Sequence, residues 1–267
     1  SGTPPWMRMF FTISTLIVAV PTGVKIFSWV ATLWGGKIRY TSGMLFAIGL
    51  LAMFVMGGLS GITLGTAPFD VHVHDSYYVV AHFHYVLFGG SVFGLYAGIY
   101  HWFPKMTGRM YNETWGRIHF VLTFIGTNLT FLPMHQLGLQ GMPRRIAMYD
   151  PQFEAINHIC TYGSILLGLS VIPFFINMVW SWMYGPKADD NPWGGLSLEW
   201  TTTSPPAIEN WEVLPVVTYG PYDFGSKKTL GIRERFKLIS KGSSKVKETG
   251  VPVSEAQSSS FDDDSQN

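Results

Sequence analysis

Two histidines, His82 and His84, stand two residues apart in an otherwise apolar run, "HDSYYVVAHFHYVLFGG" (74–90). At 3.6 residues per turn, positions i and i+2 lie about 200° apart around a helix, so the two imidazoles leave opposite faces and cannot bind one metal ion together. A zinc site of the HExxH type uses positions i and i+4 because those positions share a face. The spacing therefore predicts two separate centres, one on each side of a single helix.

Haem suits such centres, because a planar macrocycle held by an axial histidine can fill the space between helices. Phe83 separates the two ligands, and Gly89 and Gly90 follow them and leave room for bulky groups. The alternative is a pair of histidines that hydrogen-bond to neighbouring helices. Ionisable residues within a membrane are costly and usually functional, so we favour cofactor binding.

Lys25, in "VAVPTGVKIFSW", is a second costly residue in an apolar stretch. Four hydroxyl side chains fall within about 60° of it on a helical wheel: Ser14, Thr22, Ser28 and Thr32. A polar stripe that holds water, with a lysine whose pKa burial can lower, indicates a proton path along the helix. The alternative is a purely structural polar face.

Two polar loops add further candidates. "DVHVHD" (70–75) contains Asp70, and its His74 and Asp75 supply two ligands for a hard cation such as Mg²⁺, with water completing the shell. Arg144 and Arg145 form a pair of the kind that binds carboxylates through two hydrogen bonds, such as the propionates of a haem. Each feature taken alone is equally compatible with an ordinary solvated loop.

The elements that position these residues are apolar helices. The chain has 267 residues, of which 47% are hydrophobic and 13% charged, whereas soluble domains carry about 25% charged residues. Spanning a bilayer takes about 20 mainly apolar residues. Five stretches meet that length: 9–34, 44–67, 77–103, 118–139 and 157–184. Glycine, serine and threonine recur within them, which favours a packed bundle over single anchors. We therefore expect an all-α membrane protein, with residues 1–184 as its transmembrane part.

The connections indicate an orientation. Lys37 and Arg39 lie in the loop 35–43, and further basic residues lie in 104–117, so the positive-inside rule places both loops and the tail on the inner side. The loops 67–75 and 141–150 then share the outer side.

The polar C-terminal part differs in kind. Residues 185–240 are rich in Pro, Trp and Gly and predict an ordered, irregular tail, whereas 241–267 has the composition of a disordered segment. A net charge of +1 gives no electrostatic reason to expect nucleic-acid binding, and the single cysteine, Cys160, excludes an internal disulfide. We find no signal-peptide pattern and expect either a trimmed N-terminus or the second part of a longer chain.

Three segments carry a family resemblance: "PTGVKIFSWVATLWGG", "HDSYYVVAHFHYVLFGG" and "NLTFLPMHQLGLQGMPRR". They resemble the C-terminal part of subunit I of the haem–copper oxygen reductases, in particular the A-type cytochrome c oxidases. The similarity covers about residues 1–225 and extends into the tail, which resembles bacterial forms. It implies five transmembrane helices, the eighth to the twelfth of a twelve-helix bundle.

The resemblance also implies roles for individual residues. His82 matches the axial ligand of the high-spin haem (haem a3), and His84 matches an axial ligand of the low-spin haem (haem a). The remaining matches are the K-type proton channel (Thr22 and Lys25), the Mg²⁺ ligands (His74 and Asp75) and the propionate network (Asp70, Arg144 and Arg145).

Several parts of the family's site have no match in this sequence. These are the three copper-binding histidines, the tyrosine cross-linked to one of them, the second axial ligand of haem a and the acidic residue of the D-type channel. We therefore expect both haems to be shared with an N-terminal part of subunit I, and we expect no oxygen reduction by this chain alone. Subunits II and III, membrane lipid and cytochrome c are the other partners that the resemblance implies.

The implied activity is reduction of O₂ to water with electrons from cytochrome c, coupled to proton pumping, in a bacterial plasma membrane or an equivalent energy-transducing membrane. A quinol oxidase of the same superfamily would share nearly every residue named above, and a nitric oxide reductase fits less well. A proton-conducting membrane fragment with structural histidines is the alternative from a different class.

Overall fold

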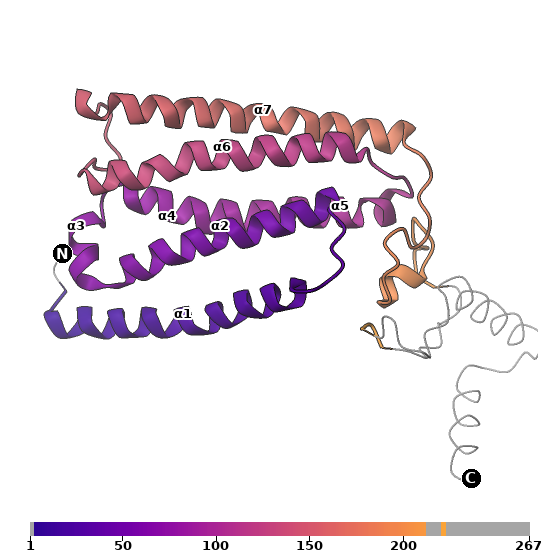
Figure 1. Cartoon of the computed structure of the whole chain (residues 1–267), viewed down its shortest axis with the longest axis horizontal. Coiled ribbons are helices and arrows are strands. Elements are labelled where there is room, and N and C mark those ends of the chain that lie inside the picture. The colour runs from indigo at the N-terminus through magenta and orange to yellow at the C-terminus, as the bar shows by residue number, and fades with distance from the viewer. Residues whose placement is uncertain (1–2, 212–219, 223–267) are drawn as a thin grey trace, which may run out of the picture. The chain divides into compact units, whose positions relative to one another are not determined.

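The computed structural model describes residues 3–211 and 220–222, and the regular structure within this part of the chain is helical (Figure 1). The chain divides into two compact units, one of Ser1–Phe103 with Met110–Pro186, and one of Pro104–Arg109 with Lys187–Asn267. The predicted all-α fold is confirmed. The disorder expected at 241–267, and part of the tail expected at 185–240, concern residues outside the described ranges.

The first unit contains the long helices. In chain order these are α1 (Pro5–Leu33), α2 (Ser42–Gly65), α3 (Ala67–Val73), α4 (Tyr77–Leu87), α5 (Phe93–Thr107), α6 (Glu113–Leu139) and α7 (Glu154–Tyr184). A π-helical segment, Phe88–Val92, joins α4 to α5, and the last turn of α5 belongs to the second unit. Within the first unit, α1 packs on α2, α2 on α4, α4 on α6 and α6 on α7, so α4 lies in the middle of the row (Figure 1).

Side-chain caps start three of these helices. The hydroxyl of Thr41 accepts a hydrogen bond from the backbone amide of Met44 at the start of α2, and Ser76 does the same for the Tyr78 amide at the start of α4. The Asn112 side chain accepts hydrogen bonds from two backbone amides in the first turn of α6. Such caps satisfy amides that have no partner within their own helix, and they fix where each helix begins.

Glycines let the helices approach closely. A Cβ atom on Gly163 of α7 would lie 2.5 Å from the backbone nitrogen of Thr130 in α6, and one on Gly126 would lie 2.9 Å from the nitrogen of Leu167. A Cβ on Gly57 of α2 would lie 2.9 Å from the nitrogen of Val86 in α4. Small residues at crossings are the means by which helices pack in lipid. The helix that carries His82 and His84, α4, therefore packs closely against the backbone of α2.

Four helical stretches in the described part are long and apolar enough to cross a membrane: Pro5–Leu33, Ser42–Gly65, Tyr77–Thr107 and Pro151–Tyr184. The fifth predicted span, 118–139, lies in α6, which has 27 residues but falls short in hydropathy. The strongly polar residues His119, Asn128 and His135 lower its mean hydropathy, and His119 is turned into the bundle and buried. Membrane crossing by α6 stays a prediction.

The second unit is organised around a lysine. The ammonium group of Lys105 donates hydrogen bonds to the backbone carbonyls of Asp190 (2.8 Å) and Thr202 (2.7 Å) and lies 5.4 Å from the centre of the Trp200 ring. A buried ammonium group needs such partners, because an unpaired buried charge is strongly destabilising. The first described part of the tail therefore folds against the end of α5.

Candidate functional site

His82 and His84 leave α4 towards different neighbours. His82 contacts α2, where a Cβ atom on Gly61 would lie 2.9 Å from the imidazole Cε1 atom. His84 faces α6, where its ring stacks on Phe131 with centroids 4.2 Å apart and an interplanar angle of 13°. The two rings thus occupy opposite sides of α4, as the spacing of two residues requires.

The hydrogen bonds of His82 identify its tautomer. Its Nδ1 atom lies 2.9 Å from the backbone carbonyl oxygen of Gly57 and 3.0 Å from the hydroxyl oxygen of Ser60. A carbonyl oxygen can only accept, so Nδ1 carries the proton and donates it. In the neutral ring Nε2 then has a free lone pair, and among the described residues it has no hydrogen-bond partner. That is the state in which imidazole binds a metal.

A cavity of about 660 Å³ lies beside His82. It is bounded by residues of α1, α2, α3 and α4, and its volume is within the roughly 300–1,000 Å³ typical of ligand and cofactor pockets. Its lining includes several polar side chains: Arg8, Thr12, Thr15, Asp70 and His74. The imidazole with the free nitrogen therefore borders a space of cofactor size.

His84 shows the same arrangement with different partners. Its Nδ1 atom donates to the backbone carbonyl of Val80, one turn earlier in α4, at 2.8 Å. The ring lies between Phe131 and Phe83, whose centroid is 4.4 Å away. Within the described part of the chain its Nε2 atom also has no hydrogen-bond partner. Both histidines therefore hold Nδ1 on a backbone carbonyl and keep Nε2 available, the pattern usual for metal-ligating histidines.

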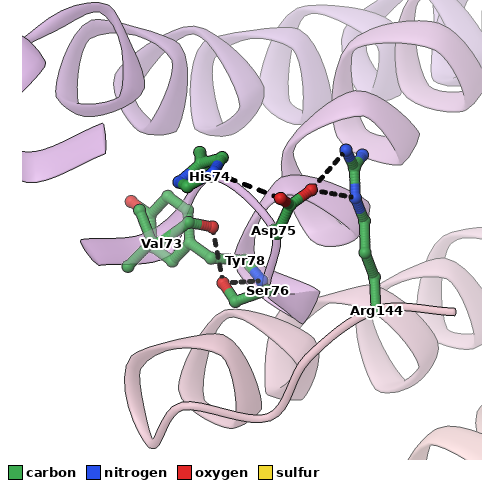
Figure 2. A network of polar contacts seen from close by, with 6 residues as sticks. All are labelled: Val73, His74, Asp75, Ser76, Tyr78 and Arg144. Carbon is green, nitrogen blue, oxygen red and sulfur yellow. Dashed lines mark hydrogen bonds and ion pairs between the residues drawn. The ribbon is translucent and has the colours of Figure 1, made fainter. Parts of the chain in front are cut away.

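The loop after α3 forms a charged cluster with the loop after α6 (Figure 2). One carboxylate oxygen of Asp75 lies 3.1 Å from Nε2 of His74, and the other accepts hydrogen bonds from Nη2 (2.9 Å) and Nε (3.2 Å) of Arg144. The backbone nitrogen of Arg144 also donates to the carbonyl of Asp75 at 2.9 Å. The hydrogen bond from the Arg144 side chain holds the pKa of the Asp75 carboxyl group below its usual value, and the charges of His74 and Arg144 act in the same direction.

The structure therefore brings together His74, Asp75 and Arg144, three of the residues predicted in these loops. Ser76 stabilises the turn that leads from α3 into α4. Its hydroxyl donates to the carbonyl of Val73 at 2.7 Å and accepts from the amide of Tyr78 at 3.2 Å (Figure 2). Among the described residues no group of three or more His, Cys, Asp or Glu side chains could hold a metal ion. His74 and Asp75 thus supply at most two ligands to a cation.

Asp70 and Arg145 lie apart from this ion pair. Asp70, in α3, lines the cavity beside His82. Arg145 is exposed and has a positive φ of 64°, which turns the chain sharply after Arg144. The two adjacent arginines therefore differ, since Arg144 is fixed to Asp75 and Arg145 extends towards the surroundings.

Lys25 and Thr22 lie on α1, a helix in which no residue is buried. The Thr22 hydroxyl donates to the carbonyl of Val18 at 3.2 Å, and the other hydroxyls of the predicted stripe, on Ser14, Ser28 and Thr32, likewise bond to carbonyls of α1. Lys25 is exposed and forms no ion pair with any described residue. The stripe is thus presented to whatever covers α1, and its role stays a prediction.

Sequence reasoning did not identify Gly57 and Ser60, which hold His82, or Arg8, Thr12 and Thr15, which line the cavity. The run "GGLSGITLG" in α2 contains the first two, and it predicted close packing without indicating a partner. Threonines and an arginine near the start of an apolar helix are common at a membrane interface. These residues could be identified only from the structure, which shows that α2 packs against both α1 and α4.

Comparison with known proteins gives a consistent result. Residues 1–166 match the family described as "Cytochrome C and Quinol oxidase polypeptide I". Cytochrome c oxidase subunit 1 of Thermostichus vulcanus is 79% identical over 228 residues, which are 85% of this chain and 41% of that protein. The protein of the same name from Synechocystis sp. is 63% identical over 225 residues, 84% of this chain and 41% of that protein.

More distant relatives agree. Cytochrome c oxidase subunit 1 of Bacillus subtilis is 45% identical over 220 residues, 81% of this chain and 35% of that protein. A solved structure described as a heme-copper terminal oxidase dimer matches in fold, with a TM-score of 0.62 and 17% identity over 93% of this chain and 53% of that chain. The chain thus spans about 41% of the length of the Thermostichus vulcanus and Synechocystis proteins.

Proposed function

The chain belongs to the cytochrome c and quinol oxidase polypeptide I family, and on that basis we propose that it works as part of subunit I of a respiratory terminal oxidase. It is a multi-pass membrane protein of the haem–copper type. The proposed activity of the assembled complex is reduction of O₂ to water with electrons from cytochrome c, coupled to proton pumping. Because the chain spans less than half of its relatives, the complete activity requires sequence from outside it.

The observation that carries this proposal is the state of the two α4 histidines. Each donates Nδ1–H to a backbone carbonyl and keeps Nε2 without a partner among the described residues, on opposite sides of one helix. His82 in addition borders a cavity of about 660 Å³, and Gly61 lies against its ring where any larger residue would collide. These features fit axial ligation of a haem iron on each side of α4.

We assign His82 to the high-spin haem (haem a3) and His84 to the low-spin haem (haem a). When bound, the haems supply the redox-active iron through which electrons reach O₂. The role of this chain is to hold Nδ1–H of each imidazole on a backbone carbonyl, which leaves the Nε2 lone pair of the neutral ring directed away from that bond and available to the iron. The aromatic contacts of His84 with Phe131 and Phe83 fix the orientation of its ring.

The charged cluster suits the outer edge of these sites. Asp70 lines the cavity beside His82, and the exposed Arg145 and the part of the Arg144 guanidinium not used by Asp75 can bind carboxylates such as haem propionates. We assign His74 and Asp75 to a Mg²⁺ ion. Because Mg²⁺ keeps several water ligands and needs only one or two protein carboxylates, two side chains from this chain are enough for a shared site.

We assign Lys25 and Thr22 to a proton path that runs along α1 from the inner side. The exposed ammonium group of Lys25 and the hydroxyls on the same stripe supply groups that can hold water and pass protons. The positive-inside rule supports placing the tail on the inner side, in a bacterial plasma membrane or an equivalent membrane.

The remaining parts of the site come from partners. We propose that an N-terminal part of subunit I supplies the copper ligands and the second axial ligand of haem a, and that subunits II and III complete the complex. Membrane lipid covers the apolar helix faces that no protein covers.

Oxygen consumption by the purified complex tests the function. We expect rapid, cyanide-sensitive uptake with reduced cytochrome c, accompanied by haem a bands in the visible spectrum. A complex that contains this chain but no haem would refute the proposal and favour a proton-conducting membrane protein with structural histidines.

The family description includes quinol oxidases, and it therefore supports a second candidate. A quinol oxidase would consume oxygen with a reduced quinol and not with cytochrome c, and its subunit II would lack a dicopper centre. The same oxygen electrode, with each donor in turn, distinguishes the two.

A further inference from the structure

Ser60 is the side chain of α2 that reaches His82. At the crossing of α2 with α4 the neighbouring residues of α2 include Gly57 and Gly61, which contribute backbone but no side chain. The Ser60 hydroxyl oxygen lies 3.0 Å from Nδ1 of His82, and Ser60 is only 6% exposed. A buried hydroxyl that is shielded from water interacts more strongly with its hydrogen-bond partners than a solvent-exposed one.

The three groups form a closed hydrogen-bond triangle. The Ser60 hydroxyl donates to the Gly57 carbonyl at 2.9 Å, and His82 Nδ1–H donates to the same carbonyl at 2.9 Å. The serine proton is committed to the carbonyl, so the serine oxygen faces Nδ1 with a lone pair. The Nδ1–H group is therefore shared between two oxygen acceptors.

Two acceptors on Nδ1–H change what the ring does at Nε2. Acceptors draw the proton away from the ring, and this raises the basicity of the imidazole as a ligand. A more basic axial ligand binds iron more tightly and stabilises its oxidised state. The hydroxyl thus acts on the iron through His82 and without touching it.

His84 provides the comparison within the same helix. Its Nδ1–H also donates to a backbone carbonyl, that of Val80, at a similar distance of 2.8 Å. Its ring contacts the aromatic rings of Phe83 and Phe131, and no side-chain hydroxyl in the described part of the chain hydrogen-bonds to it. Each histidine thus has its own backbone carbonyl as acceptor for Nδ1–H. Among the described residues, only His82 also has a side-chain hydroxyl, that of Ser60, beside Nδ1.

We propose that Ser60 is a positioning residue that strengthens His82 as an axial ligand, an effect that has no counterpart at His84 among the described residues. This inference rests on the proposed function, since it takes His82 as a haem ligand. It predicts that removing the hydroxyl alters the iron held by His82 and leaves the iron held by His84 unchanged.

The test uses the assembled oxidase complex with Ser60→Ala. Resonance Raman spectra of the reduced high-spin haem should show the iron–histidine stretching band at a lower frequency, and redox titration should give a higher midpoint potential for that haem alone. Ser60→Thr keeps a hydroxyl and should restore both values towards those of the unmodified complex. Ser164→Ala is the matched control, because Ser164 also bonds a carbonyl three residues earlier in its helix but is exposed on α7.

If Ser60→Ala fails to incorporate haem, Ser60→Cys takes its place, since it retains the size of the side chain with a weaker acceptor and should move both readouts in the same direction by less. An unmoved band and potential in a variant with full haem content would overturn the inference. If the unmodified complex has no iron–histidine band at all, the proposed function fails instead, so the two failures are distinguishable.

Discussion

Hydroxyl side chains in these apolar helices are of two kinds. Thr22, Ser28 and Thr32 bond to carbonyls within α1, which satisfies the hydroxyl and involves no second helix. Ser60 and Thr63 of α2 bond a carbonyl in the same way and also reach α4, Ser60 at His82 and Thr63 at the Tyr78 hydroxyl (2.8 Å). The first kind leaves polar groups open to a partner, and the second kind joins helices within this chain.

Lys25 on α1 gives the first prediction. Lys25→Met should slow reduction of the high-spin haem by about 10²-fold, the low end of the range for a positioned proton-transferring side chain, because electrons enter that haem together with protons. Stopped-flow spectroscopy of the complex measures the rate, and the haem content should be unchanged. Lys37→Met, in the loop after α1, is the control and should have no effect. Unchanged reduction kinetics in Lys25→Met would remove Lys25 from the proton path.

Asp75 gives the second prediction, concerning the cation. Asp75→Ala should lower the affinity of the complex for Mg²⁺ by about 10²-fold or more, since losing a ligand should cost at least as much as losing an outer partner of a ligand, about 10–100-fold. Metal analysis after dialysis against graded Mg²⁺ measures the effect. Arg144→Ala removes the ion pair without removing a ligand and should weaken binding less. Full Mg²⁺ retention by Asp75→Ala would exclude this carboxylate as a ligand.

At the scale of secondary-structure elements, the crossings between helices determine where the site residues lie. The α6–α7 contact depends on Gly126 and Gly163, each of which lies against the backbone of the other helix. The α2–α4 contact in the same way depends on Gly57, and it places Gly61 and Ser60 against His82. The placement of His82 is therefore a consequence of glycine positions in α2, a helix that is separate from α4 in sequence.

Gly163→Ala tests this packing. The added methyl group meets the backbone of α6 and should destabilise the fold by roughly 1–3 kcal/mol, the usual cost of overpacking. Gly168→Ala, five residues further along α7, meets nothing within 4 Å and should be neutral or slightly stabilising. Thermal unfolding of the detergent-solubilised complex compares the two. Equal melting temperatures would contradict the close crossing.

The elements also show what the sequence could predict. The spacing of His82 and His84 predicted opposite faces, because helical geometry alone decides it. The bond between Ser60 and His82 was not predictable, because it depends on which face of α2 meets α4, and a serine that bonds only its own helix has the same local sequence. The π-helical segment Phe88–Val92 was also not predicted, since a single widened turn leaves little trace in hydrophobic periodicity.

At the scale of the whole molecule, the sequence predicted that the loops 67–75 and 141–150 share one side of the membrane and that the loops 35–43 and 104–117 share the other. Contacts at the two ends of the first unit agree with this grouping. Asp75 meets Arg144 at one end, and at the other Glu113 accepts hydrogen bonds from the backbone amide and hydroxyl of Ser42 at 2.9 and 2.6 Å. The loops 67–75 and 141–150 therefore lie together, and so do 35–43 and the start of α6. Which end faces the inner side stays a prediction from the basic residues.

The exposed surface of α1 points to a larger assembly. This helix is apolar, lacks buried residues and borders the cavity beside His82 on one side. A cofactor in that cavity needs walls that this chain supplies only in part, which agrees with the relatives being more than twice as long. We expect the purified complex to contain the copper ligands on about seven further helices of subunit I.

The central claim is that His82 and His84 each hold one haem, and reduced-minus-oxidised spectra of the assembled complex test it directly. His82→Ala should lose the high-spin haem contribution, including its carbon monoxide shift, and retain the low-spin band. His84→Ala should lose the low-spin band, and His158→Ala, an exposed histidine of α7, should change neither. Retention of both haem contributions in either of the first two variants would contradict the account.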